Sequence, residues 1–216
     1  MLKGVIFDMD GVVVNTVGVH FEAWRKMFSE YGRRLTFKDY ELKVDGIPRI
    51  NGARAILPKL SKEKLNEAAS KKQRYFLEFL KKEGVKAYPD ALYLIKTLKR
   101  NKIKRAIISS SKNCPYILKK AKINKLFDVI ISGNDAKKGK PHPDIFLLAA
   151  KRLRLKTTEC VVVEDALLGI IAAKRAKIKS VGIDRYGKPA RLAQADLVVN
   201  NLKKASLLKL ERLVSQ

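Results

Sequence analysis

The chain has 216 residues, and 46% of them are hydrophobic, which suits one sizeable folded core and argues against a disordered protein. No stretch approaches the roughly 18 consecutive apolar residues that a membrane helix needs, and no signal peptide precedes the first apolar run. Cys114 and Cys160 are isolated, which is typical of reduced thiols and not of a disulfide framework. We therefore expect a cytoplasmic, globular monomer without a membrane partner.

The charge is strongly unbalanced, with 47 Lys and Arg residues against 21 Asp and Glu residues and a formal net charge of +26. Such a balance suits either a nucleic-acid binder or a basic surface that attracts anionic substrates. The basic residues are spread along the chain, on the polar faces or at the ends of predicted helices, and no basic tail or basic–aromatic run occurs. The pattern favours a solvated basic surface over a nucleic-acid footprint.

The predicted elements begin with one strand and continue with helices only. Residues 2–7 form a short apolar run that is typical of a buried parallel strand. Between residues 17 and 82 the apolar spacing is helical, and no strand is predicted. The helices expected there cover residues 17–31, 37–43, 49–57 and 61–82.

After Pro89, helices and strands alternate. We expect helices at 91–101, 113–121, 144–154, 166–176 and 203–214, and strands at 104–108, 128–131, 160–163, 180–183 and 197–199. This alternation implies right-handed βαβ crossovers and a parallel sheet with helices on both faces. The fold class is therefore α/β, with a Rossmann-like core domain formed by residues 1–14 and 84–216 and an inserted α-helical cap domain formed by residues 15–83.

Polar side chains follow four of the predicted strands. Parallel strands present their C-terminal ends at one edge of the sheet, where open α/β sheets bind ligands, so these side chains should meet in one crevice. Each has an ordinary explanation by itself: a helix cap, a surface charge or a helix start favoured by the dipole. Because all of these residues occur at the ends of strands, it is improbable that the ordinary explanations account for every one of them. The residues are Asp8 and Asp10, Ser109 and Ser110, Lys140, and Glu164 and Asp165.

This combination of residues suits phosphoryl transfer. The carboxylates of Asp8, Glu164 and Asp165 form a hard oxygen site for Mg²⁺, which takes few carboxylates and keeps several waters. Lys140 and the two serines would hold the phosphoryl oxygens as charge spreads in the transition state. One carboxylate of the first strand can act as the nucleophile, and the other can move a proton to the leaving oxygen.

The sequence resembles the haloacid dehalogenase superfamily of phosphotransferases over nearly the whole chain. The resemblance rests on four motifs in order: Asp8-Met9-Asp10-Gly11-Val12, Ser109, Lys140 and Glu164-Asp165. Within the superfamily the chain looks most like the β-phosphoglucomutase subfamily, because Asn15-Thr16 and the helical insertion resemble its hinge and cap. Phosphorylated receiver domains use similar residue types, but their motif order differs and they lack the insertion.

The resemblance implies a role for each core residue. Asp8 would be the nucleophile and Asp10 the general acid/base. Mg²⁺ would be held by Asp8, Glu164, Asp165 and the backbone carbonyl of Asp10. Ser109 and Lys140, beside Ser110, would bind the transferring phosphoryl group.

The cap residues are implied mainly by the same resemblance. His20 and Lys72 would couple cap closure to substrate binding. From the residues alone, His20 could also be a satisfied core histidine, and periodicity favours a core position over a ligand-binding one for Trp24. Arg49 follows Gly-x-Pro, and Arg is a plausible bidentate phosphate ligand. The substrate-binding set that the resemblance implies is His20, Trp24, Arg49, Lys72, Ser111, Lys112 and Asn113.

Three departures from the mutase pattern bear on the substrate and the hinge, not on the core chemistry. Pro48 stands where mutases commonly have Ser, Gly52 lies near a second such Ser, and Asn15 replaces a frequent hinge Asp. We predict a Mg²⁺-dependent phosphotransferase that acts on a small sugar phosphate through a phospho-aspartate intermediate. The alternative is a phosphatase of the same family, in which water takes the phosphoryl group. A distant alternative is a non-catalytic nucleic-acid-binding protein.

Overall fold

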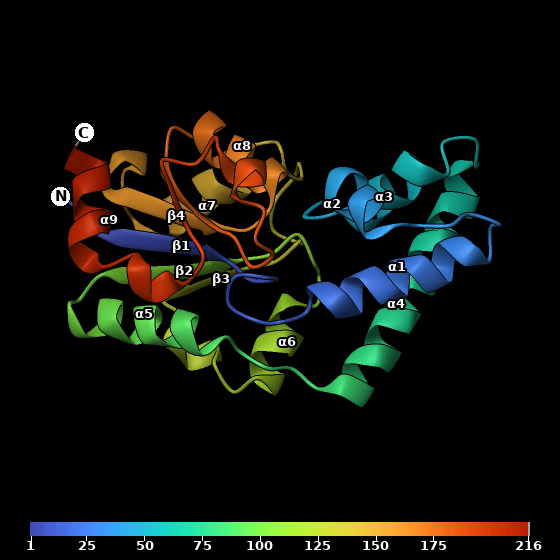
Figure 1. Cartoon of the computed structure of the whole chain (residues 1–216), viewed down its shortest axis with the longest axis horizontal. Coiled ribbons are helices and arrows are strands. Elements are labelled where there is room, and N and C mark those ends of the chain that lie inside the picture. The colour runs from blue at the N-terminus through green and yellow to red at the C-terminus, as the bar shows by residue number, and fades with distance from the viewer. Residues whose placement is uncertain (216) are drawn as a thin grey trace.

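The core of the protein is a six-stranded parallel sheet in the order β3-β2-β1-β4-β5-β6, as seen in a computed structural model that describes residues 1–215 (Figure 1). The first strand lies in the middle and pairs with β2 on one side and β4 on the other. The strand order reverses there, and open α/β sheets bind ligands outside the strand ends at such a point. The strands are β1 (Gly4–Asp8), β2 (Lys104–Ile108), β3 (Val129–Ile131), β4 (Cys160–Glu164), β5 (Lys179–Ile183) and β6 (Leu197–Val199).

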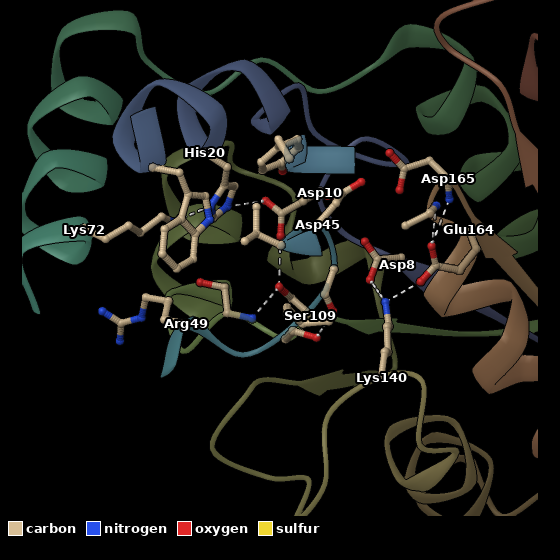
Figure 2. A pocket seen from close by; sticks show the side chains of 18 of the residues that line it. Asp8, Asp10, His20, Asp45, Arg49, Lys72, Ser109, Lys140, Glu164 and Asp165 are labelled. Carbon is tan, nitrogen blue, oxygen red and sulfur yellow. Dashed lines mark hydrogen bonds and ion pairs between the residues drawn. The ribbon is translucent and has the colours of Figure 1, made fainter. Parts of the chain in front are cut away.

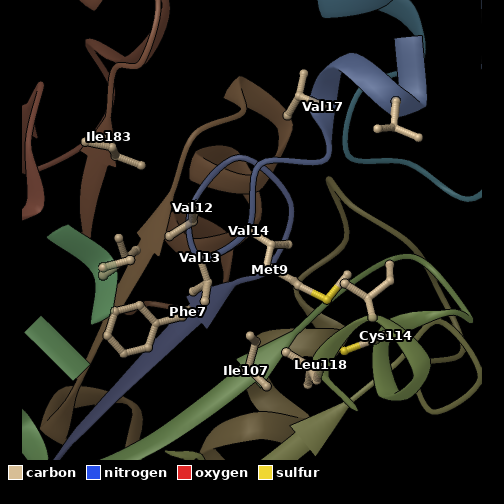
Figure 3. Close-up of a cluster of buried hydrophobic side chains, with 14 of the residues drawn as sticks. Phe7, Met9, Val12, Val13, Val14, Val17, Ile107, Cys114, Leu118 and Ile183 are labelled. Atoms are coloured by element: carbon tan, nitrogen blue, oxygen red, sulfur yellow. The ribbon is translucent and has the colours of Figure 1, made fainter. Parts of the chain in front are cut away.

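Successive residues of each strand point to opposite faces of the sheet, and helices cover both faces. Phe7 of β1 belongs to the hydrophobic cluster under α5 (Pro89–Arg100), α6 (Cys114–Lys120) and α9 (Leu207–Ser215) (Figure 3). Ile6 belongs to the cluster under α7 (Asp144–Leu153) and α8 (Leu167–Arg175). Four short 3₁₀ helices complete the core: η1 (Asn124–Leu126), η2 (Thr157–Glu159), η3 (Pro189–Leu192) and η4 (Leu202–Lys204).

Four helices between β1 and α5 form a separate layer beyond the C-terminal ends of the strands (Figure 1). Their apolar faces pack on one another, with the rings of Trp24 and Phe28 stacked at 5.2 Å and Phe76 fully buried. The helices are α1 (Val17–Ser29), α2 (Phe37–Lys43), α3 (Arg49–Ile56) and α4 (Lys62–Glu83). Among residues 1–215, no helix is both long and apolar enough to cross a membrane.

Two neighbouring segments connect this helical layer to the sheet. Val14 forms an isolated bridge with Ala87, and the Asn15 N–H donates to the Lys86 carbonyl at 2.9 Å. The two connections therefore run side by side where a hinge is expected. The division into residues 1–14 and 84–216 as core and 15–83 as cap remains a prediction, and we use those two names below.

The predicted α/β class with parallel strands and an inserted helical cap is confirmed. The main local difference concerns the last helix, which was expected at 203–214. The chain instead forms η4, turns, and begins α9 at Leu207. The Leu202 N–H donates to the Asp90 carboxylate at 2.8 Å, which holds this segment against the start of α5 and separates the turn from the helix.

Candidate active site

Asp8 ends β1 at the edge of the sheet that faces the cap, and its side chain is buried beside Lys140 (Figure 2). Lys140 Nζ donates to Asp8 Oδ1 at 2.5 Å and also to Glu164 Oε1. All three residues are at most 6% exposed. The lysine therefore acts as a buried cation between two carboxylates from different strands.

Glu164 is the last residue of β4 and Asp165 follows it, and the two complete an acidic cluster with Asp8. Glu164 Oε2 accepts the backbone N–H groups of Asp165 and Ala166 at 2.9 and 3.0 Å, which fixes its orientation. Asp8, Glu164 and Asp165 each present a carboxylate oxygen, and these atoms lie within 4.8 Å of one another. Three convergent oxygens in a buried setting match the ligand preference of Mg²⁺.

The electrostatics of this cluster also fit a divalent cation. Burial raises the pKa of Asp8 well above its usual value, with a further rise from Glu164 that Lys140 only partly opposes. Burial also raises the pKa of Asp165, and the neighbouring carboxylates of Asp45 and Glu164 add to the effect. One lysine does not neutralise these carboxylates, so a bound cation would favour their ionised forms.

Asp10 has a different environment from Asp8. Its carboxylate accepts hydrogen bonds from Thr16 Oγ1 and, at 3.0 Å, from Ser109 Oγ, and His20 Nε2 lies 3.3 Å away. Burial by itself would raise its pKa, but the neighbouring His20 and the hydrogen bonds from Thr16 and Ser109 together lower the pKa to about 2. Asp10 is therefore ionised at neutral pH and ready to accept a proton.

The serine run after β2 contacts both Asp10 and the cap. Ser109 is buried, and its hydroxyl also accepts the Ser111 N–H at 3.0 Å. Ser110 Oγ donates to the carbonyl of Gly46 in the cap at 2.7 Å. Ser109 thus belongs to the group around Asp10, whereas the Ser110 hydroxyl contacts the cap.

Two cap helices supply a basic, aromatic wall opposite Asp10. Lys72 is 1% exposed and donates to His20 Nδ1 at 2.7 Å, while the His20 ring stacks on Phe76 at 4.1 Å. An ammonium group can only donate, so His20 must accept at Nδ1 and carry its proton on Nε2, toward Asp10. Burial lowers the pKa of Lys72 to about 7, with a further contribution from Arg49.

The predicted residues for a second phosphate are only partly gathered. Arg49 Nη1 donates to the Ala69 carbonyl at 3.3 Å, and burial lowers the pKa of Arg49. Lys112 is exposed and does not line the cavity. The Asn113 side chain exchanges two hydrogen bonds with Gln73 of the cap, at 2.7 and 3.0 Å, and lies at the rim.

Cap and core enclose a cavity of about 50 Å³, which is room for only a few waters. The cap is therefore closed, and a sugar phosphate can enter only if the cap moves. Of the predicted residues, the cavity brings together Asp8, Asp10, His20, Trp24, Arg49, Lys72, Ser109, Ser110, Ser111, Lys140, Glu164 and Asp165.

Sequence reasoning missed a further carboxylate in the cap. Asp45 lines the cavity and is hydrogen-bonded by the buried Tyr40. Burial raises the pKa of Asp45 to about 6, and Glu164 adds to the rise. The sequence places Asp45 only between the predicted helices 37–43 and 49–57, and the fold shows that this segment faces the acidic cluster of the core.

Two glycines were also missed as site residues. A Cβ at Gly169 would overlap the Glu164 carboxyl group, and a Cβ at Gly11 would overlap that of Asp165. Gly11 also has a φ of +79°, which side chains other than glycine rarely adopt. The Asp-x-Asp-Gly motif could have identified Gly11 from the sequence, whereas no sequence motif identifies Gly169.

Comparisons with known proteins agree with this architecture. The family model of haloacid dehalogenase-like hydrolases matches residues 5–183. A β-phosphoglucomutase from Bacillus subtilis is 34% identical over 214 residues, covering 95% of this chain and 92% of that protein. A phosphorylated carbohydrates phosphatase from Thermotoga maritima is 34% identical over 186 residues, covering 83% of this chain and 84% of that protein.

A crystal structure of a β-phosphoglucomutase from Clostridium difficile superimposes with a TM-score of 0.90. Its sequence is 31% identical, and the match covers 100% of this chain and 98% of the other. The extent of these matches includes the cap as well as the sheet. The chain therefore belongs to the haloacid dehalogenase superfamily, in its β-phosphoglucomutase-like branch, and is an enzyme of that kind.

Proposed function

We propose that the protein is a Mg²⁺-dependent phosphotransferase of the β-phosphoglucomutase type, which moves a phosphoryl group on a small sugar phosphate through phospho-Asp8. The observation that carries the proposal is the closed cavity, in which Asp8 and Lys140 of the core meet the Lys72–His20–Asp10 series of contacts to the cap. The nucleophile Asp8, the phosphate ligand Lys140 and the acid/base Asp10 thus face one small enclosed space.

Asp8 is the nucleophile. Its carboxylate forms a bond to phosphorus while the bond from phosphorus to the sugar oxygen breaks, giving an acyl phosphate. Lys140 and Ser109 stabilise the phosphoryl oxygens as charge spreads over them. Asp8, Glu164, Asp165 and the Asp10 carbonyl would hold Mg²⁺, whose positive charge would let an anionic nucleophile approach an anionic phosphate.

Asp10 moves the proton. When a sugar hydroxyl attacks phospho-Asp8, the Asp10 carboxylate accepts the hydroxyl proton and the bond between phosphorus and Asp8 breaks. In the reverse half-reaction Asp10 returns that proton to the leaving sugar oxygen. The pKa of about 2 in the free protein matches the first, proton-accepting step.

The cap supports recognition of a substrate with a second anionic end. Arg49 and Ser111 line the cavity, and Lys112 and Asn113 stand at or outside its rim, where a second phosphate would lie beyond the transferring one. Binding would replace the Gln73–Asn113 hydrogen bonds with contacts to substrate. We assign His20, Trp24 and Lys72 to the sugar-facing wall.

The second candidate is a phosphatase with the same phospho-Asp8 intermediate. It is favoured by the Thermotoga maritima relative, which is named a phosphatase and is as similar in sequence as the Bacillus subtilis mutase. The two activities differ in whether water or a sugar hydroxyl reaches the intermediate. The tight closure around about 50 Å³ favours the mutase, because closure excludes water.

The test is turnover of β-glucose 1-phosphate with Mg²⁺ and catalytic β-glucose 1,6-bisphosphate. Glucose 6-phosphate as the product supports the mutase, and free phosphate without it supports the phosphatase. Asp8→Asn should lower either activity by about 10⁴-fold or more, because the nucleophile is lost. Glu78→Gln, at an exposed position of the cap helix α4, is the matched control and should retain activity. No turnover in a broad panel of phosphate esters would exclude both candidates.

A further inference from the structure

Helix α2 of the cap contacts the loop after β5 at a place outside the active-site cavity. Glu41 of α2 accepts a hydrogen bond from Arg191 Nη1 at 2.7 Å, and it also pairs with Lys188 at 3.4 Å. The ring of Phe37 packs edge-on against that of Tyr186, with the centroids 5.5 Å apart. Neither Glu41 nor Arg191 lines the cavity, so neither is placed to touch a substrate.

The Arg191 guanidinium contacts the core as well as the cap. Its Nη2 donates to the backbone carbonyl of Asp165 at 3.3 Å. The peptide unit that contains this carbonyl also contains the N–H of Ala166, which donates to Glu164 Oε2 at 3.0 Å. A peptide unit is planar, so the two hydrogen bonds hold one rigid group from both sides. Arg191 thereby helps to fix the segment that carries Glu164 and Asp165.

The backbone of Arg191 is itself fixed to the sheet. Arg191 lies in η3, and its N–H donates to the Lys188 carbonyl at 3.1 Å. The next residue, Leu192, is buried against β5, where a Cβ at Gly182 would lie 3.0 Å from the Leu192 Cβ. The Arg191 side chain therefore extends from a well-packed turn, and its hydrogen-bond partners decide the orientation of the guanidinium.

The pair of Glu41 with Arg191 differs from a fully exposed surface ion pair, which contributes little to stability. The Glu41 side chain is 8% exposed and that of Arg191 is 20% exposed. Arginine presents several N–H donors in one plane, so one guanidinium can bind the Glu41 carboxylate and the Asp165 carbonyl together. Lys188 contacts the same carboxylate, but its side chain is 54% exposed.

We propose that Arg191 is a positioning residue that couples closure of the cap to the geometry of the metal site. The inference rests on the proposed function, in which Glu164 and Asp165 help to hold Mg²⁺. With the cap closed, Glu41 orients the guanidinium toward the Asp165 carbonyl. When the cap opens, Glu41 moves away with α2, and the hold on this peptide unit weakens. Cap closure therefore strengthens Mg²⁺ binding, and Mg²⁺ binding must favour closure by the same factor.

The charge of Arg191 by itself predicts the opposite effect on the metal. A cation beside an acidic cluster repels Mg²⁺, so removal of that cation should strengthen Mg²⁺ binding. Loss of a hydrogen bond that positions the Asp165 segment should instead weaken Mg²⁺ binding. The direction of the change on substitution of Arg191 therefore separates a positioning role from a simple effect of charge.

The test measures Mg²⁺ binding to the full chain by isothermal titration calorimetry, which needs no turnover. Arg191→Met should weaken Mg²⁺ binding by about threefold to tenfold, as expected for the loss of one hydrogen bond. Arg191→Lys should weaken it in the same way, because an ammonium group can pair with Glu41 but lacks the planar set of donors. Lys188→Met removes a cation from the same carboxylate and is the matched control, which should change the affinity by less than about twofold.

Substitution of Glu41 tests the coupling to the cap. Glu41→Gln should weaken Mg²⁺ binding by at least about twofold, although Glu41 does not line the cavity. The same substitution should have no further effect in the Arg191→Met protein, because Glu41 acts through the guanidinium. The four proteins form a double-mutant cycle that measures this coupling. Melting temperatures in EDTA, measured for every variant, show whether the fold is retained without metal.

An Arg191→Met protein that binds Mg²⁺ as tightly as the parent, or more tightly, would overturn the inference. A loss in Glu41→Gln that persists in full after Arg191 is replaced would also overturn it. If Arg191→Met melts well below the parent in EDTA while Arg191→Lys keeps both its melting temperature and its Mg²⁺ affinity, the ion pair serves folding alone. A parent protein that binds no Mg²⁺ would overturn the proposed function, and this inference with it.

Discussion

Asp8 and Asp10 are two residues apart, yet their surroundings give them opposite acid–base properties. Burial and nearby carboxylates raise the pKa of Asp8, whereas His20 and two hydroxyl donors outweigh burial and lower that of Asp10. The first carboxylate is suited to a cation and the second to a proton. These different roles follow from the residues that surround each carboxylate in the fold, because both residues occupy the same end of β1.

The raised pKa values of Asp8 and Asp165 predict how Mg²⁺ stabilises the protein at different pH values. Above their usual pKa of 3.8 the unfolded chain releases protons that the folded protein still holds. Without metal, the free energy of unfolding therefore falls as pH rises through the raised pKa values. Mg²⁺ binds the ionised carboxylates, so it should raise the melting temperature more at pH 8 than at pH 5.

Asp45→Asn provides a matched test of that prediction. The charge of Asp45 contributes to the raised pKa of Asp165, so its removal should let Mg²⁺ stabilise the protein at lower pH. Glu78→Gln, which changes an exposed cap carboxylate outside the cluster, should leave the profile unchanged. Melting curves over a pH series with and without Mg²⁺ measure both. A Mg²⁺ effect that is equal at all pH values would contradict the assignment.

At the scale of elements, the site depends on close contacts between segments that are distant in sequence. The start of α8 must lie directly against the Glu164 carboxyl group, and this approach requires Gly169. Cap and core meet equally closely, since a Cβ at Gly139 would overlap Pro48. Contacts that join the closed cap to the core include those of Ser110 with Gly46, Gln73 with Asn113, Glu41 with Arg191, and Pro48 with Gly139.

Gly169→Ala should disturb the metal site without removing a ligand. The added methyl group would push the Glu164 carboxylate from its place between Lys140 and the backbone N–H groups of Asp165 and Ala166. Loss of such a supporting contact typically weakens metal binding by about 10- to 100-fold. Gly18→Ala is the control, because a Cβ there meets nothing within 4 Å. The readout is the Mg²⁺ concentration that gives half-maximal turnover; similar values in both variants would disprove the role of Gly169.

At the scale of the whole molecule, one buried ion pair joins the hinge loop to the sheet. Arg185, after β5, pairs with Asp90 at 2.8 Å and donates to the carbonyls of Gly11 and Val12. Asp90 also accepts the N–H of Leu202. The loop after β1, the start of α5 and the segment before α9 are thereby tied together behind the catalytic edge.

Arg185→Met should therefore destabilise the protein strongly. It leaves the Asp90 carboxylate buried without its cation, and breaking a buried pair from one side typically costs about 3–5 kcal/mol. Arg33→Met, at an exposed position, is the control and should change the free energy of unfolding by less than about 0.5 kcal/mol. Urea unfolding measures both. A loss under about 1 kcal/mol for Arg185→Met would show that the pair is well hydrated.

Much of the architecture can be predicted from local sequence patterns. The apolar runs and helical spacings predicted nearly every element within a few residues. An element buried on one face has apolar residues at regular intervals, and a strand buried on both faces is a continuous apolar run. The core motifs were visible for a related reason: Asp8 and Glu164 end buried strands, and Ser109 directly follows one. Parallel strands then bring them to one edge without further information.

The α/β class, the inserted helices and the candidate residues of the catalytic edge could be predicted from the sequence, since each depends on neighbours within one element. The positions of Asp45 beside the acidic cluster, of Gly169 against Glu164, and of Asn113 beside Gln73 depend instead on the tertiary fold. These features arise where distant segments approach, and no local pattern of side chains records such an approach.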